Sequence, residues 1–176
     1  IADNNNLQRT IYLEDKAAKD KPTKFEIELV YTSKAEYVNL FEQSKEISFN
    51  KNPEIFSEYT REQFPHIVFS ERIKKLSAQI IGDEKNPVQK LKKIFTWVDE
   101  NIPWASAREY STIKNIPMYC YENKHGDCGI QTLLFMTLAR MNGIPTRWQS
   151  GWEPTTMHDW CQMYIEPYGW VPVDQS

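Results

Sequence analysis

The chain has 176 residues, with 21 basic and 24 acidic side chains and a formal net charge of −3. A chain of this length buries about 70% of the surface that its unfolded form exposes, so it can build a core without disulfides or metals. The near balance of charge argues against nucleic acid or an anionic membrane as the main partner, and no apolar run reaches the ~20 residues of a membrane span.

Two segments near the N-terminus, Arg9–Glu14 and Lys24–Thr32, have the composition of β-strands. In the second segment apolar residues alternate with polar ones, at Phe25, Ile27, Leu29 and Tyr31. This alternation predicts one buried and one exposed face. We therefore predict an N-terminal extension that contains strands, residues 1–70, followed by a core domain, residues 71–176.

Two amphipathic helices are predicted next. The first has Ser70 as its N-cap and ends at Gly82, with Ile73, Leu76 and Ile80 on one face. The second starts at Asn86-Pro87, a cap followed by proline at the first helical position, and ends before Pro103. Its apolar residues recur in steps of three and four, at Val88, Leu91, Phe95, Val98 and Ile102. Residues 105–125 are predicted to form a long loop.

The C-terminal part predicts one buried helix and then an antiparallel sheet. Gly126–Met141 is an almost continuously apolar helical run that stops at Asn142-Gly143. Strands are expected at residues 147–152, 158–166 and 169–174, and the turn residues around Pro167 predict that the last two form a hairpin. Helices followed by antiparallel strands indicate an α+β fold.

Cys128 lies at the start of the apolar helix, where the positive end of the helix dipole stabilises a thiolate. The alternative is a small buried core residue, which is what a free cysteine usually is. Asp127 can cap the helix, and Gly126 and Gly129 leave room for a substrate backbone, so we favour a reactive thiol of lowered pKa. A histidine that pairs with such a thiol and an acid that orients the histidine would complete a nucleophilic triad.

His158 and Asp174 are the candidates for these two roles. His158 is the only histidine that begins a strand directly after the cysteine helix, and Asp174 ends the last strand. A two-residue turn at Pro167-Tyr168 would place Asp174 opposite Cys161, on the wrong face for His158. The triad therefore requires a longer loop or a bulge there. Asp159 is a poorer orienting acid, because neighbours on a strand point to opposite faces.

A metal site is the competing interpretation, since the sequence has two His-x-x-Cys pairs, at His125–Cys128 and His158–Cys161, with Cys120 nearby. In a strand, His158 and Cys161 face opposite sides, so we expect no metal and no other cofactor. Cys161 is then a core residue and Cys120 a loop cysteine. An odd count of three cysteines leaves the redox compartment open, and we favour a secreted or cell-envelope location.

Three blocks in order resemble the transglutaminase-like superfamily, the papain-related group that includes transglutaminases, peptide N-glycanases and bacterial cysteine peptidases. The blocks are Gly126-Asp127-Cys128 with Leu138–Arg147, then His158-Asp159-Trp160, then Tyr168–Asp174. With the helix Lys90–Ile102, the resemblance covers about Lys85 to Asp174. It implies a papain-like fold in which the helix with Cys128 packs on an antiparallel sheet that carries His158 and Asp174.

The resemblance also implies roles. Cys128 would be the nucleophile, His158 the general base and acid, and Asp174 the orienting acid. Family members complete the oxyanion hole with a donor upstream of the cysteine, and the indole N–H of Trp104 is the expected donor here. The alternative is that Trp104 simply packs beneath the long loop.

The implied activity is thiol-dependent acyl transfer on an amide bond of a peptide or protein substrate. Water as the second substrate makes the protein a peptidase or amidase, which the bacterial members favour, and an amine makes it a transglutaminase. A non-catalytic binding module that kept the fold is the third interpretation. Animal transglutaminases depend on calcium, but the sequence has no acidic loop of suitable spacing. Such domains normally extend further beyond the acid, so we expect a piece of a longer protein, of undetermined oligomeric state.

Overall fold

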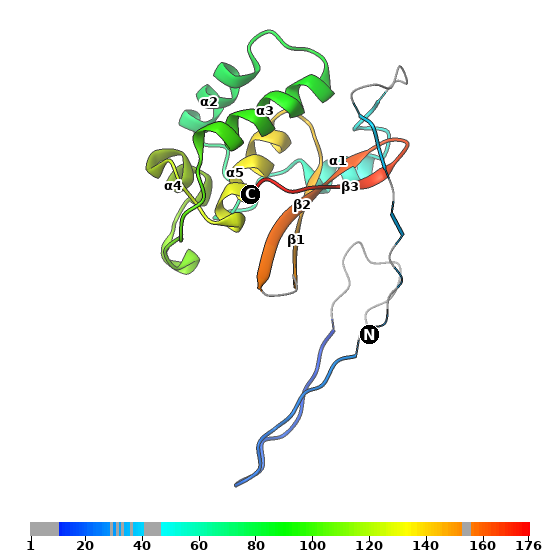
Figure 1. The fold of residues 1–176 in the computed structure, drawn as a ribbon, viewed down its shortest axis with the longest axis vertical. Helices are drawn as coiled ribbons and strands as arrows, with labels where there is room; N and C mark the ends of the chain where they lie inside the picture. The colour runs from blue at the N-terminus through cyan, green and yellow to red at the C-terminus, as the bar shows by residue number, and fades with distance from the viewer. Residues whose placement is uncertain are drawn as a thin grey trace. The chain divides into compact units, whose positions relative to one another are not determined.

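The computed structural model describes residues 11–28, 30, 32, 34–35, 37–40, 47–152 and 156–176. It separates into two compact units, residues 1–37 and 38–176. All helices and strands of the described residues belong to the second unit (Figure 1). None of these helices is long and apolar enough to cross a membrane.

The first unit has no strand among its described residues, where only a bridge between Ala18 and Lys21 closes a turn. Phe25 and Ile27, which the alternation predicts to be buried, are 51% and 53% exposed. The strand prediction is therefore wrong for the described parts of both segments, and Leu29 and Tyr31 lie outside the described residues. An alternating pattern forms a stable strand only where a further strand or a helix covers its apolar face.

The second unit begins well before residue 70, where the sequence patterns put the end of the extension. Helix α1, Pro53–Tyr59, starts at a cap by Asn52, whose Oδ1 accepts a hydrogen bond from the Ile55 N–H at 3.1 Å. Phe49 and Ile67, on either side of α1, are buried in the main core. The segment around α1 thus packs with the helices and strands that follow it.

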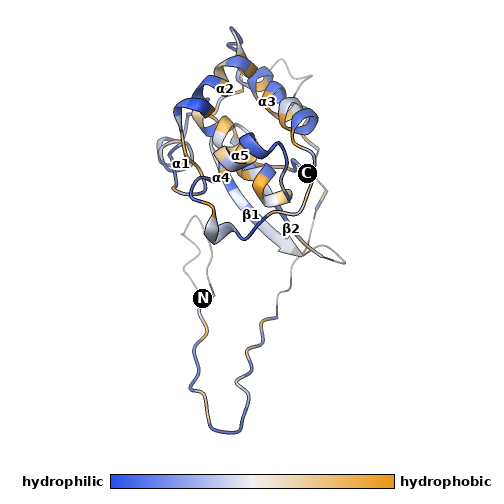
Figure 2. Ribbon diagram, turned by 90° about the vertical axis from the view of Figure 1, so that its left-hand side faces the viewer, coloured by the Kyte–Doolittle hydropathy of each residue, from blue (hydrophilic) through white to orange (hydrophobic). Residues whose placement is uncertain are grey.

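Helices α2, Glu71–Ile81, and α3, Pro87–Asn101, form as predicted. Ser70 caps α2, and the Asn86 side chain accepts hydrogen bonds from two N–H groups of the first turn of α3, at 2.9 and 3.1 Å. Each helix buries one face, with Ile73 and Leu76 from α2 and Leu91 and Val98 from α3. Figure 2 shows hydrophilic and hydrophobic residues mixed along both, as expected of helices with one exposed face.

The predicted loop at 105–125 is wrong, because it contains the short helix η1, Tyr110–Thr112, and helix α4, Ile116–Asn123. The Asn115 side chain caps α4 by accepting from the Met118 N–H at 3.0 Å, and Pro117 lies in the first turn. Asn115-Ile116-Pro117 is a start signal similar to Asn86-Pro87, with one residue between cap and proline. Cys120 is buried inside α4, so it is not a loop cysteine.

Helix α5, Cys128–Met141, is buried along nearly its whole length and packs on a three-stranded antiparallel sheet. The strands are β1, Thr146–Trp152, β2, Met157–Ile165, and β3, Gly169–Val173, in the order β1-β2-β3 (Figure 1). The α+β class and the hairpin of the last two strands are confirmed.

The register of this hairpin decides where Asp174 lies. Ile165 pairs with Gly169 and Cys161 with Val173, so the connection has three residues rather than two. Gly169 follows it with φ +76°, a conformation that L side chains rarely adopt. Continued by one residue, the register places Asp174 opposite Trp160 rather than Cys161. The longer loop that the triad requires is therefore present.

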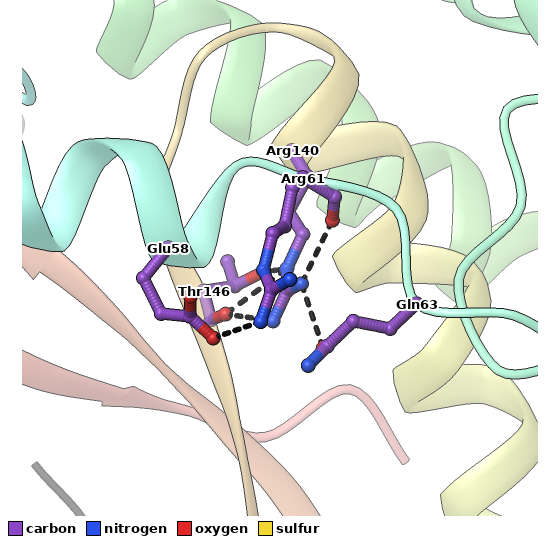
Figure 3. Close-up of polar contacts among 5 residues, drawn as sticks. All are labelled: Glu58, Arg61, Gln63, Arg140 and Thr146. Carbon is purple, nitrogen blue, oxygen red and sulfur yellow. Dashed lines mark hydrogen bonds and ion pairs between the residues drawn. The ribbon is translucent and has the colours of Figure 1, made fainter.

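Arg140 joins three segments at the C-terminal end of α5 (Figure 3). Its side chain is only 3% exposed. One guanidinium nitrogen donates to the Arg61 carbonyl and to Gln63 Oε1, both at 2.9 Å, and the other donates to the Thr146 carbonyl at 2.6 Å. Burial lowers the pKa of Arg140 to about 10. The buried cation thus ties α5 to the chain after α1 and to the first residue of β1.

We predict that Arg140→Met lowers the free energy of unfolding by about 2–4 kcal/mol, because buried carbonyls of two segments lose their donor. Urea unfolding measures the change. Arg61→Ala is the matched control, since the Arg61 side chain forms only an exposed ion pair with Glu58 and its carbonyl stays in place. Equal losses in the two variants would contradict the proposed role of the Arg140 hydrogen bonds.

Candidate active site

Cys128 is the first residue of α5, and its side chain is partly buried. Asp127 caps the helix, with Oδ1 accepting a hydrogen bond from the Ile130 N–H at 2.9 Å. The thiol lies beside β2, with Sγ 4.0 Å from Asp159 Oδ2. The prediction that Cys128 lies at the start of this helix is confirmed.

The electrostatic environment of this thiol differs from the prediction. Burial raises the pKa of Cys128 above its ordinary value, and the carboxylates of Asp159 and Asp127 add to the increase because they repel a thiolate. Backbone hydrogen bonds from Asp159 and Gly129 favour the thiolate but do not reverse this increase. The predicted low pKa is therefore wrong for this arrangement. The positive end of the helix dipole acts here against two nearby negative charges. Asp127 precedes the thiol in the sequence, whereas Asp159 becomes its neighbour only because β2 packs against α5.

His158 and Asp174 form the contact that the sequence predicts. Nε2 of His158 lies 2.8 Å from Asp174 Oδ2. The other carboxylate oxygen of Asp174 accepts from the Ser176 N–H at 3.2 Å, and the imidazole stacks on the Trp160 ring at 6.0 Å between centroids. The orientation of the ring is thus held from two sides, and Nδ1 is the nitrogen that remains for another partner.

The thiol and the histidine are not joined. Among the residues that the structure describes, no hydrogen bond links Cys128 to His158. Strand parity gives the reason: Asp159 shares a face of β2 with the buried Cys161, toward α5, while His158 shares the opposite face with Trp160. The structure therefore brings His158 to Asp174 and Asp159 to Cys128, and it leaves the two pairs separate.

The backbone of Trp104, rather than its ring, pairs with the segment just before Cys128. It bridges to Gly126, and the Ala105 N–H donates to the Gly126 carbonyl at 2.9 Å. The Trp104 side chain is 63% exposed, so the alternative that it packs beneath a loop is wrong. Its role as an oxyanion donor stays a prediction, supported by a backbone that pairs two residues before Cys128.

Two aromatic residues that the sequence did not single out close around the start of α5. The Tyr110 hydroxyl donates a hydrogen bond to Asp127 Oδ1, and burial together with this carboxylate raises the pKa of Tyr110. A Cβ at Gly129 would collide with that hydroxyl and would lie 3.0 Å from the tip of the Trp148 ring. Only glycine therefore fits beside Cys128. Tyr110 lies 18 residues before the cysteine, and no sequence pattern links the two.

The residues weighed as metal ligands lie in different environments. Cys161 is completely buried in the core on the face of β2 away from His158, as predicted. All three cysteines are free thiols. In the described part of the chain, no group of three His, Cys, Asp or Glu side chains is arranged to hold a metal ion.

A family model matches the part of the chain that holds these residues. The family model of the transglutaminase-like superfamily matches residues 74–175, more than half of the chain, and the chain belongs to this superfamily. No curated protein matches it in sequence.

Two crystal structures share the fold. A "putative cysteine protease" from Cytophaga hutchinsonii has a TM-score of 0.59 at 20% identity, over 72% of this chain and 43% of that one. The periplasmic domain of TgpA from Pseudomonas aeruginosa has a TM-score of 0.57 at 14% identity, over 72% of this chain and 48% of that one. Identities this low show a common fold alone, and this chain spans less than half of either protein.

We predict that Asp159→Asn lowers the pKa of Cys128, because the substitution removes a negative charge that disfavours the thiolate. In the unchanged protein, the rate of alkylation by iodoacetamide should rise with pH at a midpoint above the ~8.5 of an ordinary thiol. The variant should shift this midpoint downward, with modified Cys128 identified by mass spectrometry. Asp99→Asn, an exposed change on α3, is the control and should leave the profile unchanged. An unaltered profile in the Asp159 variant would refute the assignment.

Proposed function

We propose that this chain is the catalytic core of a cysteine-nucleophile enzyme that hydrolyses amide bonds of a peptide or protein substrate. One observation carries the proposal. His158, which Asp174 holds in place, is next to Asp159 on β2, and the Asp159 carboxylate is 4.0 Å from the Cys128 thiol. The thiol at the N-terminus of α5 is thus contacted by the strand residue that neighbours an imidazole with a fixed tautomer.

The chemistry follows from these groups. His158 accepts the thiol proton at Nδ1, the sulfur of Cys128 attacks the carbonyl carbon, and a tetrahedral intermediate forms. The protonated imidazole then gives its proton to the leaving amine, and an acyl-enzyme remains. Water attacks this thioester, and the carboxylic acid and the free thiol are released. Because the pKa of Cys128 is raised in the resting arrangement, the thiol depends on this base for its ionisation.

Catalysis requires Nδ1 of His158 to come within hydrogen-bond distance of the Cys128 thiol while Nε2 keeps its contact with Asp174. Catalytic contacts are often long in the free enzyme and shorten when substrate binds.

The oxyanion of the tetrahedral intermediate needs donors at the start of α5. The first N–H groups of an α-helix have no acceptor within the helix, and the Asp127 side chain uses that of Ile130. The Cys128 N–H is therefore the proposed first donor, and the Trp104 indole N–H the second. Both N–H groups would donate to the oxyanion as its negative charge develops during the reaction.

We predict that Cys128→Ala abolishes hydrolysis of a peptide library, because the nucleophile is lost. Product peptides are identified by mass spectrometry. Cys161→Ala is the matched control: Cys161 is buried in the core on the face of β2 away from His158, so activity should stay within about threefold at temperatures where the variant is folded. Equal inactivation of both variants at full folding would exclude Cys128 as the only nucleophilic thiol. Product formation with an added primary amine in place of water would identify a transglutaminase, and an inactive, folded protein would indicate a binding module.

Asp174→Asn should reduce kcat by about 10²–10⁴-fold, because an amide cannot hold the imidazole in the same tautomer or stabilise its protonated form. Steady-state kinetics on a peptide that the unchanged protein cleaves gives the value. Ser176→Ala is the control, since it removes the hydroxyl near Asp174 Oδ1 and leaves the contact between Oδ2 and His158. Unchanged kcat in the Asp174 variant would remove the acid from the mechanism.

A further inference from the structure

A cavity of about 410 Å³ lies along α5 on the side of β1. Its walls include two buried residues of α5, Leu133 and Met136, and the ring of Trp148 from β1. Ligand sites in proteins commonly have volumes of about 300–1,000 Å³. Of the described residues that line the cavity, none is an Asp, Glu, Lys or Arg, so it favours an uncharged occupant.

Two residues that line the cavity also lie beside Gly129, the residue that follows Cys128. Gly129, Leu133 and Met136 are spaced by four and three residues, which places them on one face of α5. Tyr110 and Trp148 line the cavity and also close over Gly129, the residue after Cys128. Leu133 lies one turn further along the helix, about 6 Å from Gly129. An extended peptide advances about 3.3 Å per residue, so a side chain within a residue or two of a carbonyl at Cys128 reaches this space.

We propose that this cavity binds a bulky apolar side chain, aromatic in preference, next to the reacting carbonyl of a peptide substrate. The inference rests on the proposed function for the position of that carbonyl. The apolar walls favour binding because they remove the substrate side chain from water. The edge of the Trp148 ring can pack against an aromatic ring of the substrate. At the rim, Gln63 is held by its hydrogen bond from Arg140, so the mouth of the cavity is fixed to the C-terminal end of α5.

The binding test uses the 1–176 chain carrying Cys128→Ser and methionine with a ¹³C-labelled methyl group. N-acetyl-phenylalaninamide should shift the Met136 methyl resonance in a saturable manner. Its dissociation constant should be at least tenfold lower than those of N-acetylglycinamide and N-acetyl-lysinamide. His66 is exposed at the rim, so His66→Trp should block the cavity and abolish the shift without loss of folding, while His66→Ala should keep it. No saturable shift, equal affinity for the glycine compound, or full binding in His66→Trp would overturn the proposal.

A second measurement separates this inference from the proposed function. With the active thiol present, kcat/KM should be at least tenfold higher for a peptide with phenylalanine next to the cleaved bond than for its glycine analogue, and His66→Trp should bring the ratio toward one. Cleavage of both peptides at equal rates would overturn the cavity proposal and leave the thiol hydrolase intact. Binding at Met136 without cleavage of any peptide would instead remove the hydrolase and leave the cavity as a site for an apolar side chain.

Discussion

Arg140 puts a positive charge at the buried end of α5, where oxygen atoms of the backbone and of Gln63 accept its hydrogen bonds. A buried cation is tolerated only where its donors are all satisfied, so its partners have to stay in place. The partners belong to the chain after α1 and to the start of β1. Through them the helix that carries the cysteine, the first strand of the sheet and one wall of the cavity share a single fixed point. Cys128 lies at the opposite end of this helix, so its position depends on how Arg140 anchors α5.

At that opposite end, the alternation of β2 controls which side chain meets the thiol. Adjacent strand residues point to opposite faces, so Asp159 and His158 cannot both lie beside Cys128. In the structure the carboxylate has that place, and burial together with negative charge raises the pKa of the Cys128 thiol. In the proposed mechanism the thiol ionises when Nδ1 of His158 comes within reach of its proton.

Gly129 lies between the Cys128 thiol and the wall of the cavity. Tyr110 and Trp148 occupy the space that a side chain at Gly129 would need. The two aromatic residues line the cavity on one side and the approach to the thiol on the other.

Membership of the transglutaminase-like superfamily accounts for the helix and sheet, and the superfamily match begins only at residue 74. Gln63, His66 and Ile67 of the cavity come from the segment before it, so the proposed preference for an apolar side chain belongs to this chain rather than to the common core.

Local patterns in the sequence were enough to predict α2, α3, α5 and the hairpin, because caps, prolines and helical spacing act within a few residues. They also indicated that Asp174 needs a longer connection before β3 to face the same way as His158, and the three-residue loop provides it. Other features depended on contacts between distant segments. The exposure of Phe25 follows from the absence of a covering layer among the described residues, and the cavity needs four separate segments. The neighbours of the thiol were the decisive case. The helix dipole is a local effect that sequence reveals, whereas the burial of the Cys128 thiol, which raises its pKa, and the carboxylate of Asp159 beside it follow only from how β2 packs against α5.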